Sequence, residues 1–320
     1  MKLTERDKKI LGFLFHHNRD SVADIAKKLN IPRQVVDYNI KRYISDGIIK
    51  KFFTVFNYEA LGYNLQVMLF VKLKNLHEKQ NFLNSMPKNI LISKGEALTK
   101  YHLFFNLLFK DQFSLNEVLS KIISQEIVED YLLVNPYSFE LYPLKFLGEN
   151  KSNIYDLKKE NKIKPEISID KTDIEILKAL NDDGRVRVID IANKLKANPE
   201  TILYKLKRLQ KEEIILGNRI QFNMSKFGFH YSLALVNIKN LNKEKEKKLV
   251  HFFRKHLFIN SYGLFLNNPN CFFQIFHKTE EELRNTLFDF EKMMENNSYE
   301  INLIPLFEAE SEEINTLPFY

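Results

Sequence analysis

Apolar residues recur at helical spacing in two stretches of the chain, each with a polar opposite side. Val36, Ile40 and Tyr43 share one side of a helix in the first stretch, and Ile202, Leu206 and Leu209 do so in the second. The opposite sides carry Gln34, Tyr38, Lys41 and Ser45 in the first stretch, and Glu200, Tyr204, Lys207 and Lys211 in the second. One such helix is more often a solvated amphipathic helix, but a packed back with a polar, aromatic and basic front also fits the major groove of DNA.

The two stretches belong to a long internal repeat. Residues 3–62 align with residues 169–228 without a gap, and 19 of the 60 aligned pairs are identical. Composition would give far fewer identities, so the chain is a duplication. Two copies favour pairing within the chain over a solenoid. The identical pairs include Asp7/Asp173, Arg19/Arg185, Asp24-Ile25-Ala26/Asp190-Ile191-Ala192, Lys41-Arg42/Lys207-Arg208 and Gly62/Gly228.

Each copy begins with three predicted helices and a wing. Thr4 can cap a first helix that runs to about residue 17, and Ser21 can cap a short second helix over residues 22–29. Pro32 and Pro199 mark the turn before the third helix, where a missing N–H costs nothing. Gly47 ends the third helix, and residues 48–56 read as a strand pair or wing. This order predicts a winged helix-turn-helix.

The remainder of each copy has the order βαββαβ. In the first copy, strands are expected at 64–74, 90–98, 100–110 and 128–144, the last interrupted by Pro136, and helices are expected at 77–88 and 114–125. In the second copy, strands are expected at 231–239, 259–266, 271–277 and 299–308, and helices at 243–255 and 279–294. This order predicts a ferredoxin-like domain with helices on one face of an antiparallel sheet. Several strands are apolar on both faces, so we expect the two sheets to pack face to face.

These patterns predict an α+β fold, a tandem duplication of a winged helix-turn-helix plus a ferredoxin-like βαββαβ domain. The expected helix-turn-helix units are residues 1–62 and 169–229, and the expected ferredoxin-like domains are residues 63–147 and 230–310. Residues 148–168 are polar and mixed in charge, which predicts a linker, and residues 311–320 are expected to form a tail.

Composition limits the range of possible functions less than the repeat does. A formal net charge of +7 permits binding to nucleic acid, but a chain rich in Lys, Asn, Ile and Phe gains such a charge from A·T-rich coding as well. There is no apolar run of about 18 residues, so no membrane span is expected. The charged N-terminus reads as a helix rather than a signal peptide. The single cysteine, Cys271, excludes an internal disulfide and a cysteine-based zinc site, and it fits a cytoplasmic location.

The chain resembles the Lrp/AsnC (feast/famine) transcription regulators over about 300 residues, as two fused subunits. The resemblance implies a DNA-binding regulator with RAM-type ferredoxin-like domains and with no catalytic activity, metal or cofactor. The family's Gly-x-x-Asp turn reads Thr99-Lys100-Tyr101-His102 here and Asn267-Asn268-Pro269-Asn270-Cys271 in the second copy, so an amino-acid effector is left open, as is association into higher homo-oligomers. The matching positions are Leu3, Asp7, Asp24-Ile25-Ala26, Val36, Ile40, Tyr43, Gly47-Ile48-Ile49, Asn57 and Gly62.

We expect the partner to be double-stranded DNA. Glutamine can read adenine bidentately, while lysine and arginine can hold phosphates. Because Gln34 aligns with Glu200, the two copies are expected to read different bases of an asymmetric target. The expected DNA contacts are Arg33, Gln34, Tyr38, Lys41, Arg42, Lys50 and Lys51 in the first copy, and Tyr204, Lys205, Lys207, Arg208, Lys211 and Arg219 in the second.

Two other functions remain open from the sequence. Siroheme decarboxylases have the same domain pair, and their subunits can be fused. That resemblance needs a histidine two positions before a strand that starts like Tyr101-His102-Leu103-Phe104, where this chain has Thr99. The second copy offers no substitute. The other alternative is a dimerisation or effector-sensing module that has lost DNA binding, and Glu200 on the front of the second copy leaves this open.

Overall fold

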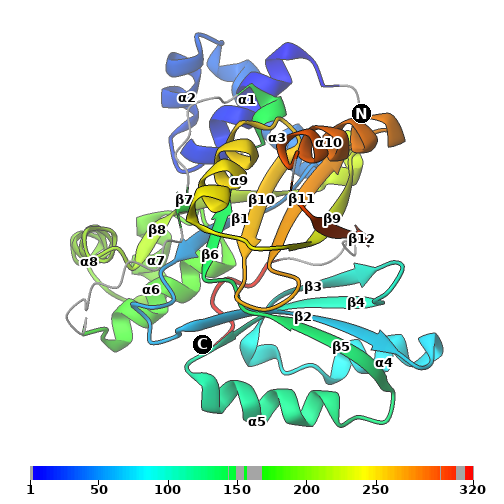
Figure 1. The fold of residues 1–320 in the computed structure, drawn as a ribbon. Coiled ribbons are helices and arrows are strands. Elements are labelled where there is room, and N and C mark those ends of the chain that lie inside the picture. Colours follow the sequence, from blue (N-terminus) through cyan, green and yellow to red (C-terminus); the bar gives the residue numbers. More distant parts are fainter. Residues whose placement is uncertain are drawn as a thin grey trace.

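The computed structural model describes residues 3–142, 144–148, 155–156, 168–295, 297–307 and 314–319. Most of the expected linker and part of the expected tail lie outside these residues. Each copy begins with three helices, as the sequence predicts, and the helix-turn-helix units lie at the edges of the molecule (Figure 1). The helices are α1 (Glu5–His17), α2 (Val22–Leu29) and α3 (Arg33–Ser45) in the first copy, and α6 (Lys171–Asp182), α7 (Val188–Leu195) and α8 (Pro199–Lys211) in the second.

Short polar side chains fix where these helices begin. The hydroxyl of Thr4 accepts a hydrogen bond from the backbone N–H of Asp7, and the Asp7 carboxylate accepts one from the N–H of Thr4, so α1 begins with a capping box. The hydroxyl of Ser21 accepts a hydrogen bond from the backbone N–H of Asp24 and so caps α2. Asn198 caps α8, where Pro199 takes the first helical position, whereas α3 has no side-chain cap.

The wing is shared between the copies: residues 48–56, expected to form a strand pair or wing, contain one strand, and its partner comes from the other copy. Strand β1 (Ile49–Phe56) of the first copy pairs antiparallel with β8 (Ile215–Phe222) of the second. Phe56, which has no exposed surface, packs into the core of α6, α7 and α8, while Phe222 stacks on Phe15 of α1. Each helix-turn-helix therefore completes its core with the strand of the other copy.

The ferredoxin-like domains have the expected βαββαβ order. Their helices α4 and α5 cover the outer face of one sheet, and α9 and α10 cover that of the other (Figure 1). The first copy contains β2 (Leu65–Leu73), η1 (Leu76–Glu78), α4 (Lys79–Ser85), η2 (Lys88–Ile90), β3 (Leu91–Ala97), β4 (Leu103–Phe109), α5 (Gln112–Ile123), β5 (Val128–Val134), β6 (Ser138–Leu141), η3 (Lys145–Leu147) and β7 (Tyr155–Asp156). The second contains η4 (Met224–Phe227), β9 (His230–Ile238), α9 (Lys243–Lys255), β10 (Ile259–Leu264), β11 (Cys271–His277), α10 (Glu280–Met293) and β12 (Tyr299–Phe307).

The two sheets join into one, with the strand order β5-β2-β4-β3-β12-β9-β11-β10-β6-β7. At one junction β12 of the second copy pairs with β3 of the first, and at the other β6 of the first copy pairs with β10 of the second. Strand β6 follows β5 along the chain after Asn135, Pro136 and Tyr137, although β5 lies at one end of this order and β6 lies near the other. The stretch over residues 128–144, expected to be strand-like with an interruption at Pro136, forms the two strands β5 and β6, and the chain crosses to the other sheet between them.

The inner faces of the sheets share one core, as the sequence predicts. Phe70 and Phe104 of the first sheet belong to the same cluster of buried side chains as Leu235 and Phe272 of the second. This cluster continues into α1, α2 and α3, so the first helix-turn-helix has no separate core. Among the described residues, none of the helices combines the length and apolar composition that a bilayer crossing needs.

The C-terminal segment binds the second helix-turn-helix to the shared wing. Leu317 is 2% exposed and lies in the core of α6, α7 and α8. The hydroxyl of Thr316 donates to the carbonyl oxygen of Thr54 on β1 at 2.8 Å. Phe319 stacks on Tyr63, with ring centroids 3.8 Å apart. The expected tail is thus, where it is described, part of the folded core.

Candidate functional site

The front of α3, defined as Gln34, Tyr38, Lys41 and Ser45, faces solvent along its whole length. The ring of Tyr38 is 65% exposed, although tyrosine is usually at least half buried. Lys41 forms an ion pair with Asp37 at 2.7 Å, and its side chain is 75% exposed. An ion pair this exposed contributes little stability, so Lys41 remains available to an external anion.

The front of α8, defined as Glu200, Tyr204, Lys207 and Lys211, is exposed in the same way. Tyr204 is 69% exposed, close to the value of Tyr38 at the equivalent position. The opposite side of each helix is buried, since Val36 and Tyr43 of α3 and Ile202 and Leu209 of α8 have no exposed surface. Both copies therefore present the front that the apolar spacing predicts.

Three basic residues expected to hold phosphates instead bind carboxylates inside the protein. Arg42 donates to Asp7 of α1 at 2.6 Å, and the hydroxyl of Tyr43 donates to the same carboxylate. In the second copy, Arg208 and Lys205 both donate to Asp173, which is fully buried. These residues fasten the third helix of each copy to the first.

The buried carboxylate of Asp7 stays ionised despite its surroundings. Burial raises its pKa, but hydrogen bonds from Thr4 and Tyr43 and the charge of Arg42 lower it by more, so the net pKa lies below its usual value. The negative charge that Arg42 requires is therefore present at neutral pH. Arg42 therefore contributes to the packing of α3 against α1 and is not available to bind a phosphate.

The basic residues of the wing strands do not extend the two fronts either. Lys50 and Lys51 are half-buried on β1, and the ammonium group of Lys51 donates to the carbonyl oxygen of Ile314 in the C-terminal segment. Arg219 of β8 is 4% exposed and lies over the ring of Phe15, 5.3 Å from its centroid. The expected phosphate contact by Arg219 is wrong, because its guanidinium lies inside the protein. Of the residues expected to contact DNA, those on the surface of α3 and α8 are Arg33, Gln34, Tyr38, Lys41, Tyr204, Lys207 and Lys211.

Hydrogen bonds between the copies fix the two helix-turn-helix units relative to one another. The guanidinium of Arg19 donates to the carbonyl oxygens of Gly184 and Val186 in the second copy, at 2.6 and 2.9 Å. The N–H of Gly184 in turn donates to the carbonyl oxygen of Phe52 on β1. A Cβ at Gly184 would lie 2.9 Å from the backbone nitrogen of Phe53, so only glycine permits this approach.

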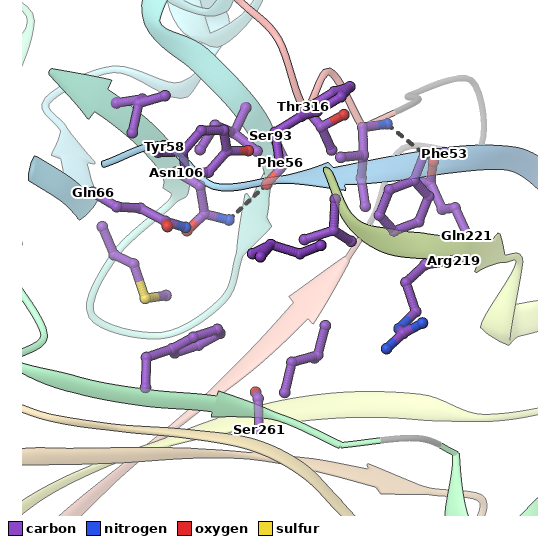
Figure 2. Close-up of a pocket in the computed structure, with 18 of the residues that line it drawn as sticks. Phe53, Phe56, Tyr58, Gln66, Ser93, Asn106, Arg219, Gln221, Ser261 and Thr316 are labelled. Carbon is purple, nitrogen blue, oxygen red and sulfur yellow. Dashed lines mark hydrogen bonds between the residues drawn. The ribbon is translucent and has the colours of Figure 1, made fainter. Parts of the chain in front are cut away.

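A cavity of about 1180 Å³ lies between the inner faces of the two sheets, with β1 and β8 as its third wall. Figure 2 shows Arg219 and Ser261 extending into it from different walls. The side-chain nitrogen of Asn106 donates to the hydroxyl of Ser93 at 2.6 Å, and the hydroxyl of Ser261 donates to the side-chain oxygen of Gln274 at 3.2 Å. These two pairs lie in opposite sheets, so polar groups face the cavity from both sides.

Sequence reasoning missed this cavity, although the repeat contains a signal for it. Ser93-Lys94-Gly95 and Phe104-Phe105-Asn106 return as Ser261-Tyr262-Gly263 and Phe272-Phe273-Gln274, each shifted by 168. The glycines are required because a Cβ would lie 2.4 Å from the ring of Phe104 in one copy and 2.3 Å from that of Phe272 in the other. These residues lie beyond the part of the repeat that aligns residues 3–62 with residues 169–228.

Comparison with known proteins identifies the family. The family described as winged helix-turn-helix DNA-binding matches residues 3–50 and again residues 169–215. An HTH-type transcriptional regulator of Pyrococcus furiosus is 30% identical over 129 residues, which cover 40% of this chain and 84% of that protein. An uncharacterised HTH-type transcriptional regulator of Pyrococcus horikoshii is 30% identical over 130 residues, with the same coverage.

Among solved structures, the siroheme decarboxylase NirDL is similar over almost the whole chain. The match covers 99% of this chain and 96% of that one, with a TM-score of 0.65 and 14% sequence identity. At this identity the likeness concerns the fold, a tandem arrangement of the same two kinds of domain. The sequence relatives are regulators, and the chain therefore belongs to the family of HTH-type transcriptional regulators, of the Lrp/AsnC kind that its sequence resembles, with two copies in one chain.

Proposed function

We propose that this chain is a sequence-specific regulator that binds double-stranded DNA with the fronts of α3 and α8, as an intrachain pseudo-dimer. The observation that carries the proposal is the equivalent exposure of Tyr38 and Tyr204 on helices whose opposite sides are fully packed. An exposed helix front with aromatic and basic side chains fits the major groove in shape and charge. Such a regulator works in the cytoplasm and needs no cofactor.

The two fronts differ in chemistry, which supports an asymmetric target. Gln34 can donate to and accept from an adenine edge, whereas Glu200 can only accept, for example from the amino group of cytosine. The antiparallel pairing of β1 with β8 joins the two helix-turn-helix units that carry the fronts. The target is therefore expected to be two unlike half-sites at one fixed spacing.

The test is a gel-shift titration on DNA fragments selected by the wild-type chain from a random pool. Lys41→Glu is expected to weaken binding about tenfold or more and to reduce the slope of log affinity against log salt concentration by about one or more. Lys207→Glu is expected to act likewise, and the double variant is expected to lose binding at physiological salt.

Lys121→Glu is the matched control for the charge change. Lys121 also forms an ion pair with the residue four positions earlier, and its side chain is 73% exposed, but it lies on α5, outside the helix-turn-helix units. Its substitution is expected to leave the affinity within about twofold, since a distant surface charge acts weakly at this salt. Unchanged binding by the Lys41→Glu/Lys207→Glu variant would contradict the proposal.

A second candidate is a siroheme decarboxylase-like enzyme, favoured by the full-length likeness to NirDL. One solved NirDL structure is a complex with an iron-uroporphyrin III analogue. The described residues that line the cavity here include the cations Arg219 and Lys94, the carboxylates Glu59 and Glu213, and no histidine. A uroporphyrin carries many carboxylates. The two cations of the cavity would not neutralise them, because Glu59 and Glu213 already offset the positive charge of Arg219 and Lys94. A shifted porphyrin absorbance band on titration with iron-uroporphyrin would favour the enzyme over the regulator.

A further inference from the structure

Leu203 is an exposed aliphatic residue beside the front of α8. It is 43% exposed, and α8 lies at the edge of the molecule (Figure 1). Consecutive residues of a helix advance by about 100°, so Leu203 lies about 40° from Lys207 and about 60° from Glu200 around the helix axis. Leu203 therefore borders the front of α8 and faces solvent together with it.

The position of Leu203 along α8 is one from which a recognition helix reads bases. Leu203 is the fifth residue of α8, directly before Tyr204 and one turn after Glu200. In helix-turn-helix proteins the N-terminal residues of the recognition helix contact the base edges, while other residues contact the backbone. The inference below rests on the proposed function, because it concerns which base α8 reads.

The first copy has a different side chain at the equivalent position. Asp37 of α3 aligns with Leu203, and it forms an ion pair with Lys41 at 2.7 Å. Lys207 aligns with Lys41, but in the described part of the second copy no carboxylate pairs with it. The exchange of aspartate for leucine thus exposes an apolar group on α8 and removes the acid that would compete with a phosphate for Lys207.

An exposed leucine at this place has one natural counterpart in the major groove. The 5-methyl group of thymine is the apolar group that base pairs present there. Contact between this methyl group and the Leu203 side chain would remove apolar surface of both from water, which is favourable. Asp37 cannot make the same contact in the first copy, because its carboxylate would lose hydration against a methyl group.

We propose that Leu203 is a specificity-determining residue, which reads one thymine of the target through the 5-methyl group. Lys207 lies on the same side of α8 and binds a phosphate, which holds Leu203 against the base edge. The half-site of α8 therefore requires a thymine that the half-site of α3 does not.

The test removes methyl groups from the DNA one at a time. Deoxyuridine replaces each thymine in turn in a fragment selected by the wild-type chain, and it pairs with adenine as thymine does. One such replacement is expected to weaken binding by the wild-type chain about fourfold, as for one buried methyl group. Leu203→Ala is expected to bind the thymine and deoxyuridine forms of this position equally, because the contact is already absent.

Two further variants keep this comparison specific. Leu203→Met retains an apolar side chain of similar size and is expected to keep most of the methyl dependence. Ile189→Ala is the matched control, since Ile189 is 50% exposed in the same helix-turn-helix but lies on α7. It is expected to keep the fourfold dependence in full, and its loss there would contradict the assignment to Leu203.

The outcomes separate this inference from the proposed function. Leu203→Ala is expected to bind the deoxyuridine fragment within about twofold of the wild-type affinity for that fragment, which shows that the variant is folded and binds DNA. The same methyl dependence in Leu203→Ala as in the wild-type chain, or wild-type binding that depends on no thymine methyl group, would overturn this inference alone. A wild-type chain that retains no fragment at all would overturn the proposed function and this inference with it.

Discussion

At the scale of single residues, the buried carboxylates Asp7 and Asp173 hold the third helix of each copy in place. Asp7 receives Arg42 and the hydroxyl of Tyr43, while Asp173 receives Arg208 and Lys205. The second donor to the carboxylate is thus the Tyr43 hydroxyl in the first copy and the Lys205 ammonium in the second. Lys205 lies one helical turn before the position on α8 that is equivalent to Tyr43. The orientation of each front therefore depends on a buried carboxylate on the opposite side of the third helix.

Asp173→Asn is expected to lower the free energy of unfolding by about 3 kcal/mol, because it leaves Arg208 and Lys205 without their buried negative partner. Urea denaturation measures the change. Asp190→Asn is the matched control, since Asp190 pairs with Arg187 on the surface and its loss is expected to have no measurable effect. Equal effects of the two substitutions would show that Asp173 has no special structural role.

His16 on α1 is expected to make stability depend on pH. Burial, and after it the charge of Arg219, lower the pKa of His16 to about 4, from about 6.5 in the unfolded chain. Between these values the unfolded chain binds the proton and the folded chain does not, so stability falls as the pH drops from 6.5 toward 4. Other histidines with lowered pKa values, such as His256, add to this slope.

Thermal denaturation between pH 4 and pH 7 measures this dependence. His16→Gln is expected to flatten the curve, because the side chain no longer titrates. His77→Gln, at an exposed histidine, controls for the loss of an imidazole. An equally steep curve in His16→Gln would show that the proton uptake occurs elsewhere.

The exposed residues of the two fronts could be predicted because helical spacing alone decides which side faces the core. The roles of Arg42, Arg208 and Arg219 could not. Arg42 lies beside the exposed front on a helical wheel, and its partner Asp7 is 35 positions away along the chain. The partner of a basic side chain is set by tertiary packing, which periodicity does not record.

At the scale of elements, the two copies differ in how their second helix ends. The residue after α2 is Asn30 with φ 54°, and the residue after α7 is Lys196 with φ 51°. Both are left-handed, and asparagine tolerates this region better than lysine because its short side chain can bond locally. The left-handed residue that ends the second helix therefore costs less conformational energy in the first copy than in the second.

Exchanging these two residues tests the difference. Lys196→Asn is expected to stabilise the chain by about 0.5 kcal/mol, and Asn30→Lys to destabilise it by a similar amount. Both sites are exposed, so little other packing changes. Urea midpoints measure both effects, and shifts of the same sign would contradict the explanation.

In the wing, the positions of the strands could be predicted from the sequence, but their pairing could not. A strand after the third helix is evident from the sequence in both copies, and β1 and β8 occupy the expected positions. Their pairing with each other was missed because the two strands are equivalent in the repeat, so each could in principle pair within its copy or across. Phe56 and Phe222 favour pairing across the copies, because each packs into the helix-turn-helix core of the other copy.

At the scale of the whole molecule, the C-terminal segment joins parts that are distant along the chain. It reaches the second helix-turn-helix through Leu317, the wing through Thr316, and β3 through the bond from the N–H of Asn315 to the carbonyl oxygen of Ile92. Sequence reasoning placed a tail here, because a short segment after the last strand has no periodicity to indicate its packing.

Leu317→Ala is expected to lower the free energy of unfolding by about 2–4 kcal/mol, as for other fully buried leucines. Leu266→Ala, at an exposed leucine, is expected to have no comparable effect. Chemical denaturation followed by circular dichroism gives both values. A small change in Leu317→Ala would mean that the second helix-turn-helix does not need the segment.

The pairing of strands across the copies has a consequence for synthesis. Strands β1, β3 and β6 belong to the first copy, yet they pair with β8, β12 and β10 of the second. While the ribosome is still making the second copy, these three strands present open edges, which readily pair with other chains. The first copy is therefore expected to need protection, for example by a chaperone, until the second copy has been synthesised. A truncated messenger RNA that encodes only the first copy would yield a protein prone to aggregation.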